Sequence, residues 1–140
     1  KAIELCASRM DEEALQQIVL RDTLIDGILQ KIPEVRLNGH RTKRLPNNAN
    51  LSITYIEGEA MLLNLDMKGI AASTGSACTS SSLEPSHVLL AIGLPHEIAH
   101  GSLRFSFGRW STKEDVDYVL ETLPTIVANL RAMSPLYEPH

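Results

Sequence analysis

The spacing of apolar residues at the start of the chain predicts a long amphipathic helix. From about residue 2 to 31, apolar positions recur every three or four residues, beginning at Ile3, with one gap at Arg21. Pro33 should end this helix, because a proline in a helix interior removes a backbone hydrogen bond and its ring clashes with the preceding turn. Within this helix, Cys6 is expected to be a packed structural residue.

A second long helix is predicted near the end of the chain. Ser111 and Glu114 fit the S-x-x-E capping box, in which each side chain accepts a hydrogen bond from the backbone N–H of the other residue. The apolar positions that follow, from Val116 to Met133, again step by three or four. Pro124 lies inside this pattern and should kink the helix.

Shorter patterns between these helices predict a small sheet. Residues 51–56 and 102–107 alternate apolar and polar side chains, as expected of strands with one buried face. Weaker patterns predict strands over 34–37 and 70–73 and helices over 59–68 and 86–92. The order of these elements predicts one α+β domain over residues 1–140, with helices packed on one face of the sheet.

The composition is that of an ordinary globular protein, with 44% hydrophobic and 21% charged residues. The net charge is −4 and the basic residues are scattered apart from GHRTKR at 39–44, so nucleic-acid binding is not expected. No apolar run reaches the ~18–20 residues that span a bilayer, and no signal-peptide pattern is present, so we expect a cytoplasmic protein without a membrane segment. The chain begins without Met, inside a helical pattern, and is therefore expected to be part of a longer protein.

Cys78 is the first candidate for chemistry. It lies in TGSACTSSS, residues 74–82, where no side chain is larger than Thr or Cys, so a mobile surface loop is expected. A lone cysteine is more often a small buried hydrophobic residue, but small polar neighbours leave this sulfur accessible as a nucleophile. Pro85 and Gly93 fit the start and the end of the helix that follows the loop.

Arg104 is the second candidate. The alternation over residues 102–107 places it on the polar face of a strand, between Ser102 and Ser106. An arginine on a strand is ordinarily a solvated or ion-paired surface group. Here the small serines leave room for a small anion, and a planar guanidinium can bind a carboxylate through two parallel hydrogen bonds. The pattern is therefore compatible with a carboxylate-binding residue as well as with an ordinary surface group.

A third pattern favours a different class of protein. His96, Glu97 and His100 match H-E-x-x-H, in which two histidines one helical turn apart bind zinc beside a general-base glutamate. Pro95 and Gly101 leave scarcely more than one turn of helix for this motif, and no third ligand is evident. A zinc hydrolase is therefore a remote alternative, and a packing or helix-end role explains His100 more simply.

Both candidate residues lie in a segment that is similar to a known family. The segment STGSACTSSSLEPSHVLLAIGLPHEIAHGSLRFSFGRWSTKEDVDYV, with ANLSITYIEGEAMLLNLDMKGI before it and LRAMSPLY near the end, resembles the C-terminal third of NifS/IscS-type cysteine desulfurases. The resemblance covers nearly the whole chain, although Thr74 stands where Ser is more usual. It implies the small C-terminal domain of the pyridoxal-phosphate-dependent transferase fold, of aspartate aminotransferase type, with a mainly antiparallel sheet.

The resemblance also implies a role for each candidate. Cys78 matches the family's catalytic cysteine, which takes sulfur from L-cysteine bound to pyridoxal phosphate, giving an enzyme persulfide and L-alanine. Arg104 matches the arginine that holds the carboxylate of the substrate. An iron–sulfur scaffold protein would then receive the sulfur for cluster assembly, and the complete enzyme would be a homodimer.

The cofactor's Schiff-base lysine is not recognisable in this chain. None of its lysines has the sequence context that the family requires; they are Lys1, Lys31, Lys43, Lys68 and Lys113. The resemblance places the cofactor site in a larger domain upstream, so the chain by itself is expected to be inactive. A non-enzymatic persulfide carrier or interaction module remains an alternative beside the H-E-x-x-H hydrolase.

Overall fold

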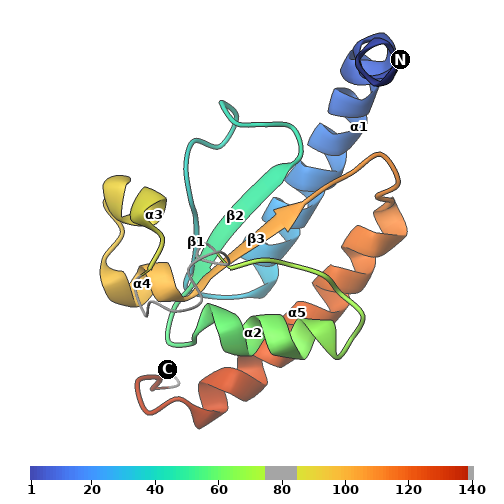
Figure 1. Cartoon of the computed structure of the whole chain (residues 1–140). Coiled ribbons are helices and arrows are strands. Elements are labelled where there is room, and N and C mark those ends of the chain that lie inside the picture. The colour runs from blue at the N-terminus through green and yellow to red at the C-terminus, as the bar shows by residue number, and fades with distance from the viewer. Residues whose placement is uncertain (75–84, 139–140) are drawn as a thin grey trace.

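A computed structural model describes residues 1–74 and 85–138 of the chain. Along the chain its elements are α1 (Ala2–Lys31), β1 (Val35–Leu37), β2 (Asn48–Ile53), α2 (Gly58–Asp66), α3 (His87–Ala91), α4 (His96–His100), β3 (Ser102–Ser106) and α5 (Lys113–Met133) (Figure 1). The three strands form one antiparallel sheet in the order β1-β2-β3. The predicted α+β fold is confirmed.

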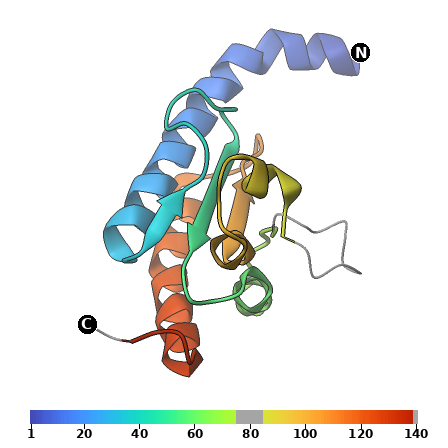
Figure 2. The same cartoon turned by 90° about the vertical axis from the view of Figure 1, so that its left-hand side faces the viewer.

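Residue alternation along the strands gives the sheet one apolar and one polar face. Leu37, Leu51 and Leu103 are partners across the three strands, and they lie on the same face of the sheet. The long helices α1 and α5 cover this face, whereas the short helices α3 and α4 lie on the other side of the sheet (Figure 2). α2 packs between α5 and β3 at the sheet edge.

One continuous core joins the apolar face to these helices. Its most deeply buried large side chains are Leu24, Ile25, Ile28, Leu51, Ile53, Met61, Leu65, Leu103, Leu123, Val116 and Val127. Burying an aliphatic side chain of this size contributes about 1.5–3 kcal/mol relative to leaving it in water. The core therefore provides most of the stabilisation that holds α1 and α5 against the sheet.

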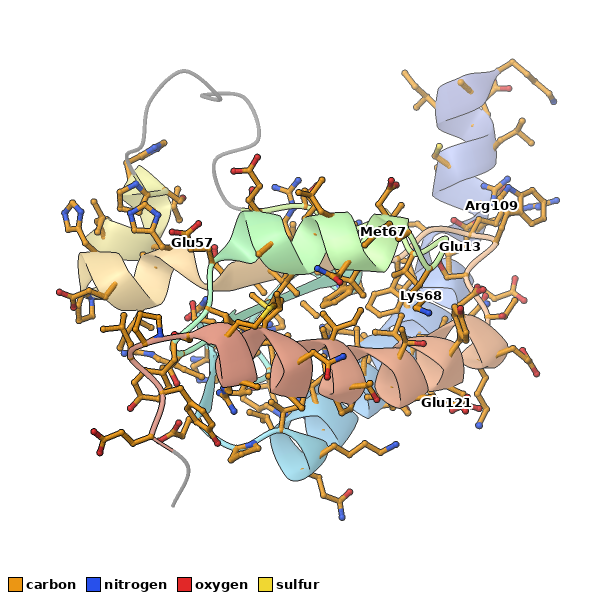
Figure 3. The ribbon with its side chains drawn as sticks, turned by 90° about the horizontal axis from the view of Figure 1, so that it is seen from below. Glu13, Glu57, Met67, Lys68, Arg109 and Glu121 are labelled. Carbon is orange, nitrogen blue, oxygen red and sulfur yellow. The ribbon has the colours of Figure 1, made fainter. Side chains whose placement is uncertain are left out.

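The first half of α1 departs from the sequence prediction. The helix spans the predicted residues, but its buried positions begin only at Leu20, and Ile3 and Met10 are 85% and 64% exposed. Cys6, predicted to be packed, is also exposed. In Figure 1 these turns extend past the sheet, so no core lies beneath their apolar side. Arg109 pairs with Glu13 at 2.6 Å and joins this half of α1 to the β3–α5 connection (Figure 3).

Two predicted strand boundaries were wrong. β2 begins three residues before the predicted strand and ends at Ile53 instead of residue 56. Tyr55, which continued the alternation, has a left-handed φ of 68° in the turn after β2. The predicted strand over 70–73 is reduced to a single bridge at Ser73.

The cap of α5 is one residue later than predicted. Thr112 Oγ1 accepts from the Asp115 N–H at 3.3 Å, and Asp115 Oδ2 accepts from the Thr112 N–H at 2.8 Å. Ser111, the predicted cap, instead accepts from the Gly108 N–H. The Ser111–Glu114 and Thr112–Asp115 pairs both fit the capping pattern, and the fold uses the second. No helix among the described residues is long and apolar enough to cross a membrane.

Gly101→Ala should destabilise the domain. A Cβ at this position would lie 2.1 Å from the carbonyl oxygen of Ile53 and 2.9 Å from that of Ile56. Because both atoms belong to the backbone, the end of β2 must shift, at a cost of about 1–3 kcal/mol. Urea unfolding should show a lower midpoint for Gly101→Ala but not for the control Gly108→Ala, whose Cβ would meet nothing within 4 Å. Equal midpoints would contradict this account of the packing.

Candidate functional site

Arg104 lies at the middle of β3 and points away from the core. Its neighbours Leu103 and Phe105 are buried in the apolar core, while Arg104 itself is exposed on the opposite face. Its predicted place on the polar face is therefore confirmed. Within residues 1–74 and 85–138, no hydrogen bond or ion pair engages the guanidinium group. Among these residues its donors are left for an external anion.

The segment that contains Cys78 begins next to Arg104. Residues 75–84, and with them the candidate nucleophile, lie outside the described residues. Just before them, the Ser73 N–H donates to the Arg104 carbonyl at 3.1 Å, and the Arg104 N–H donates to the Ser73 carbonyl at 2.7 Å. After them, Pro85 is buried, but it lies two residues before α3 and is not the helix start that the sequence predicted. The backbone of Arg104 thus fixes the point from which the Cys78 segment departs.

Several polar residues on the strands next to Arg104 were not identified from the sequence. Asn50 is the cross-strand partner of Arg104, and its side-chain oxygen accepts from Asn38 Nδ2 at 2.7 Å. The same nitrogen donates to Ser52 Oγ at 2.8 Å. The available sequence signal was the alternation of Asn48, Asn50 and Ser52 with apolar residues, which marks a polar sheet face. It could not show which residues bond across the strands.

A cluster of arginines holds the connection between β1 and β2. Arg44 donates to the carbonyl of Asn38 at 2.5 Å and to that of His40 at 2.8 Å. Burial, followed by the nearby charges of Arg21 and Arg41, lowers the pKa of Arg44. These bonds to the main chain give Arg44 a structural role, and they fix the backbone that carries Asn38.

The lysines of the chain do not fit a pyridoxal phosphate site. Lys31 donates to the Leu120 carbonyl, Lys113 pairs with Asp117 on the surface of α5, and Lys68 follows α2 at the edge of the domain (Figure 3). The two others lie at the first residue and in the β1–β2 connection. Attachment of this cofactor needs a lysine placed with an acidic partner for the pyridine nitrogen, and these scattered positions do not provide it.

The H-E-x-x-H segment forms α4, a helix of five residues. His96 and His100 are both exposed. Within the described part of the chain, no group of three or more His, Cys, Asp or Glu side chains is placed to hold a metal ion. A catalytic zinc site normally uses three protein ligands, so the described residues give the hydrolase alternative no support.

Comparison with known proteins agrees with this fold. A solved structure titled "NIFS-LIKE PROTEIN" superposes with a TM-score of 0.79 at 29% identity, covering 92% of this chain and 32% of that one. The fold is thus that of the NifS-like proteins. The chain belongs to the aminotransferase class-V family, whose model matches residues 1–119.

Two curated relatives are more similar in sequence. Cysteine desulfurase IscS of Methanosarcina thermophila is 62% identical over 136 residues, which are 97% of this chain and 33% of that protein. Cysteine desulfurase IscS of Clostridium botulinum is 61% identical over 140 residues, covering 99% of this chain and 35% of that protein. The chain therefore spans about a third of the length of these relatives. The family resemblance noted in the sequence is confirmed.

Ser73→Pro should release the segment that precedes residue 75 from β3. The substitution removes the N–H that donates to the Arg104 carbonyl. Only the hydrogen bond from the Arg104 N–H to the carbonyl of residue 73 then remains in the bridge. The Arg104 amide should exchange with solvent at least about tenfold faster, measured by residue-resolved hydrogen exchange. Ser73→Ala is the control, because it keeps the N–H and should leave exchange unchanged. Equal protection of Arg104 in both variants would show that the bridge does not hold this segment.

Proposed function

We propose that this chain is the sulfur-accepting part of a cysteine desulfurase. The observation that supports it best is the pairing of Ser73 with Arg104, since it brings the residue that precedes the Cys78 segment beside the strand position of the exposed Arg104. Arg104 binds the carboxylate of L-cysteine, and Cys78 receives its sulfur. The carbon–sulfur bond of the substrate breaks and a sulfur–sulfur bond forms on Cys78. L-cysteine and the Cys78 thiol thus become L-alanine and a Cys78 persulfide.

A larger domain supplies the cofactor in this proposal. The curated relatives are about three times as long as this chain, and the lysines here do not form a cofactor site. The exposed apolar side chains on the first half of α1 give such a domain a surface to pack against. The complete enzyme is then a cytoplasmic homodimer that uses pyridoxal phosphate and passes sulfur to an iron–sulfur scaffold protein.

A persulfide carrier without enzymatic activity is the second candidate function. It rests on the same Cys78 but does not require Arg104 to bind a substrate. Adding the cofactor-binding domain of a desulfurase to the isolated chain separates the two. Restored release of alanine from cysteine supports the desulfurase, whereas persulfide on Cys78 only when a different sulfur-donating enzyme is present supports the carrier.

Cys78→Ser should abolish persulfide formation in the complete enzyme, because a hydroxyl group cannot accept the sulfur in this form. Mass spectrometry of the protein after incubation with L-cysteine measures the added sulfur atom. Cys6→Ser is the matched control, since this exposed thiol on α1 has no part in the proposed chemistry. Persulfide that persists in Cys78→Ser and disappears in Cys6→Ser would overturn the assignment.

Arg104→Lys should weaken the binding of L-cysteine by about tenfold or more, because an ammonium group cannot reproduce the paired hydrogen bonds of a guanidinium. The effect should appear in KM for L-cysteine measured on the complete enzyme. Arg36→Lys is the control, because Arg36 is exposed on the same polar face but belongs to β1. An unchanged KM in Arg104→Lys would remove Arg104 from the substrate site.

A further inference from the structure

A row of polar residues crosses the sheet at the level of Arg104. Asn50 of β2 is paired with Arg104 of β3, and the Asn38 N–H donates to the Asn50 carbonyl on the other side. Ser73 continues the row beyond β3. Cross-strand partners project to the same face of a sheet, so these side chains line the polar face together. This face lies opposite the one that α1 and α5 cover (Figure 2).

Asn38 fixes the orientation of the Asn50 amide. Asn38 Nδ2 donates to Asn50 Oδ1 at 2.7 Å, so the oxygen of the Asn50 carboxamide faces β1. The nitrogen lies on the other side of the same planar group and so faces β3, the strand that carries Arg104. In residues 1–74 and 85–138 no acceptor bonds this nitrogen. Two donors are therefore presented on the side of Arg104, whose guanidinium group likewise has no partner among the described residues.

The Asn38 side chain is more than a simple structural link between strands. It is 6% exposed, and its Oδ1 has no hydrogen-bond partner within the described structure. A buried acceptor without a partner costs free energy, and an apolar side chain at this position would avoid that cost. The orientation of Asn38 that leaves its Oδ1 without a partner is also the orientation that fixes the Asn50 amide nitrogen on the side of Arg104.

We propose that Asn50 is a second binding residue for the substrate carboxylate and that Asn38 is its positioning residue. This inference rests on the proposed function. A carboxylate has about four lone-pair positions. The fork of Arg104 uses two of them, and the Asn50 amide donates to another. The site selects ligands that carry a carboxylate, because a ligand without one leaves both sets of donors unpaired.

Asn50→Ala and Asn50→Asp in the complete enzyme test this proposal. Losing one hydrogen bond to a charged group should raise KM for L-cysteine by about tenfold in Asn50→Ala, with kcat within about twofold. Asn50→Asp should raise it further, because its carboxylate repels that of the substrate. Asn38→Ala, which frees the Asn50 amide to turn, should give a smaller increase. Asn48→Ala is the matched control, since Asn48 lies on the same face of β2 but is paired with Ser106.

Equilibrium binding separates a carboxylate contact from a general effect on the fold. Calorimetry should show weaker L-alanine binding in both Asn50 variants, and unchanged binding of cysteamine, which lacks a carboxylate. The loss from Asn50→Ala should also be smaller in an Arg104→Lys background, because both residues bind the same group. If Asn50→Asp does not fold, Asn50→Ala and this double-variant cycle still test whether Asn50 contacts the carboxylate. An equal loss for both ligands would overturn the proposal.

Failure of the proposed function gives a different result. In that case the unsubstituted enzyme releases no alanine from L-cysteine. L-alanine binding that still depends on Asn50 would support the carboxylate site without the desulfurase reaction. L-alanine binding that is equal in the unsubstituted and both Asn50 proteins would overturn the site itself.

Discussion

The pairing of β3 on both of its edges is the constraint on which the rest of the structure depends. On one edge β3 is joined to β2 from Ser102 to Ser106, and on the other Arg104 exchanges two backbone hydrogen bonds with Ser73. The first pairing sets which side chains enter the core. The second determines where the chain leaves the sheet before the Cys78 segment. One strand thus positions the core side chains, the exposed Arg104 and the start of the segment that contains Cys78.

Burial separates the arginines of this chain by role. Arg21 and Arg131 are each 3% exposed and donate to main-chain carbonyls, Arg21 to that of Leu45 and Arg131 to those of Pro33 and Thr54. Such bonds compensate a buried charge and consume its donors. Arg104 is exposed and its donors have no such partner in the described residues. A ligand can reach it without first breaking a structural contact.

The α1 helix has two different environments along its length. From Leu20 onward it packs on the sheet and α5, and Gly27 permits close contact with Leu120 there, since a Cβ would lie 2.5 Å from that side chain. Its first half carries the same apolar periodicity but is exposed. The apolar periodicity runs through the whole helix, but only the second half is buried in this domain. We expect this of a helix that packs against two domains, in agreement with the proposed larger domain.

The sequence by itself determined the two long helices, the three strands of the sheet, the polar face that bears Arg104 and the family, because periodicity and motif are local properties of the chain. It did not determine the end of β2 or the cap of α5, since Tyr55 and Ser111 fit the local patterns as well as the residues that the fold uses. Only the tertiary structure decided that Ser73 pairs with Arg104 and that Asn38 orients Asn50. Those contacts join residues far apart in the sequence, and they depend on strand register, which no local pattern specifies.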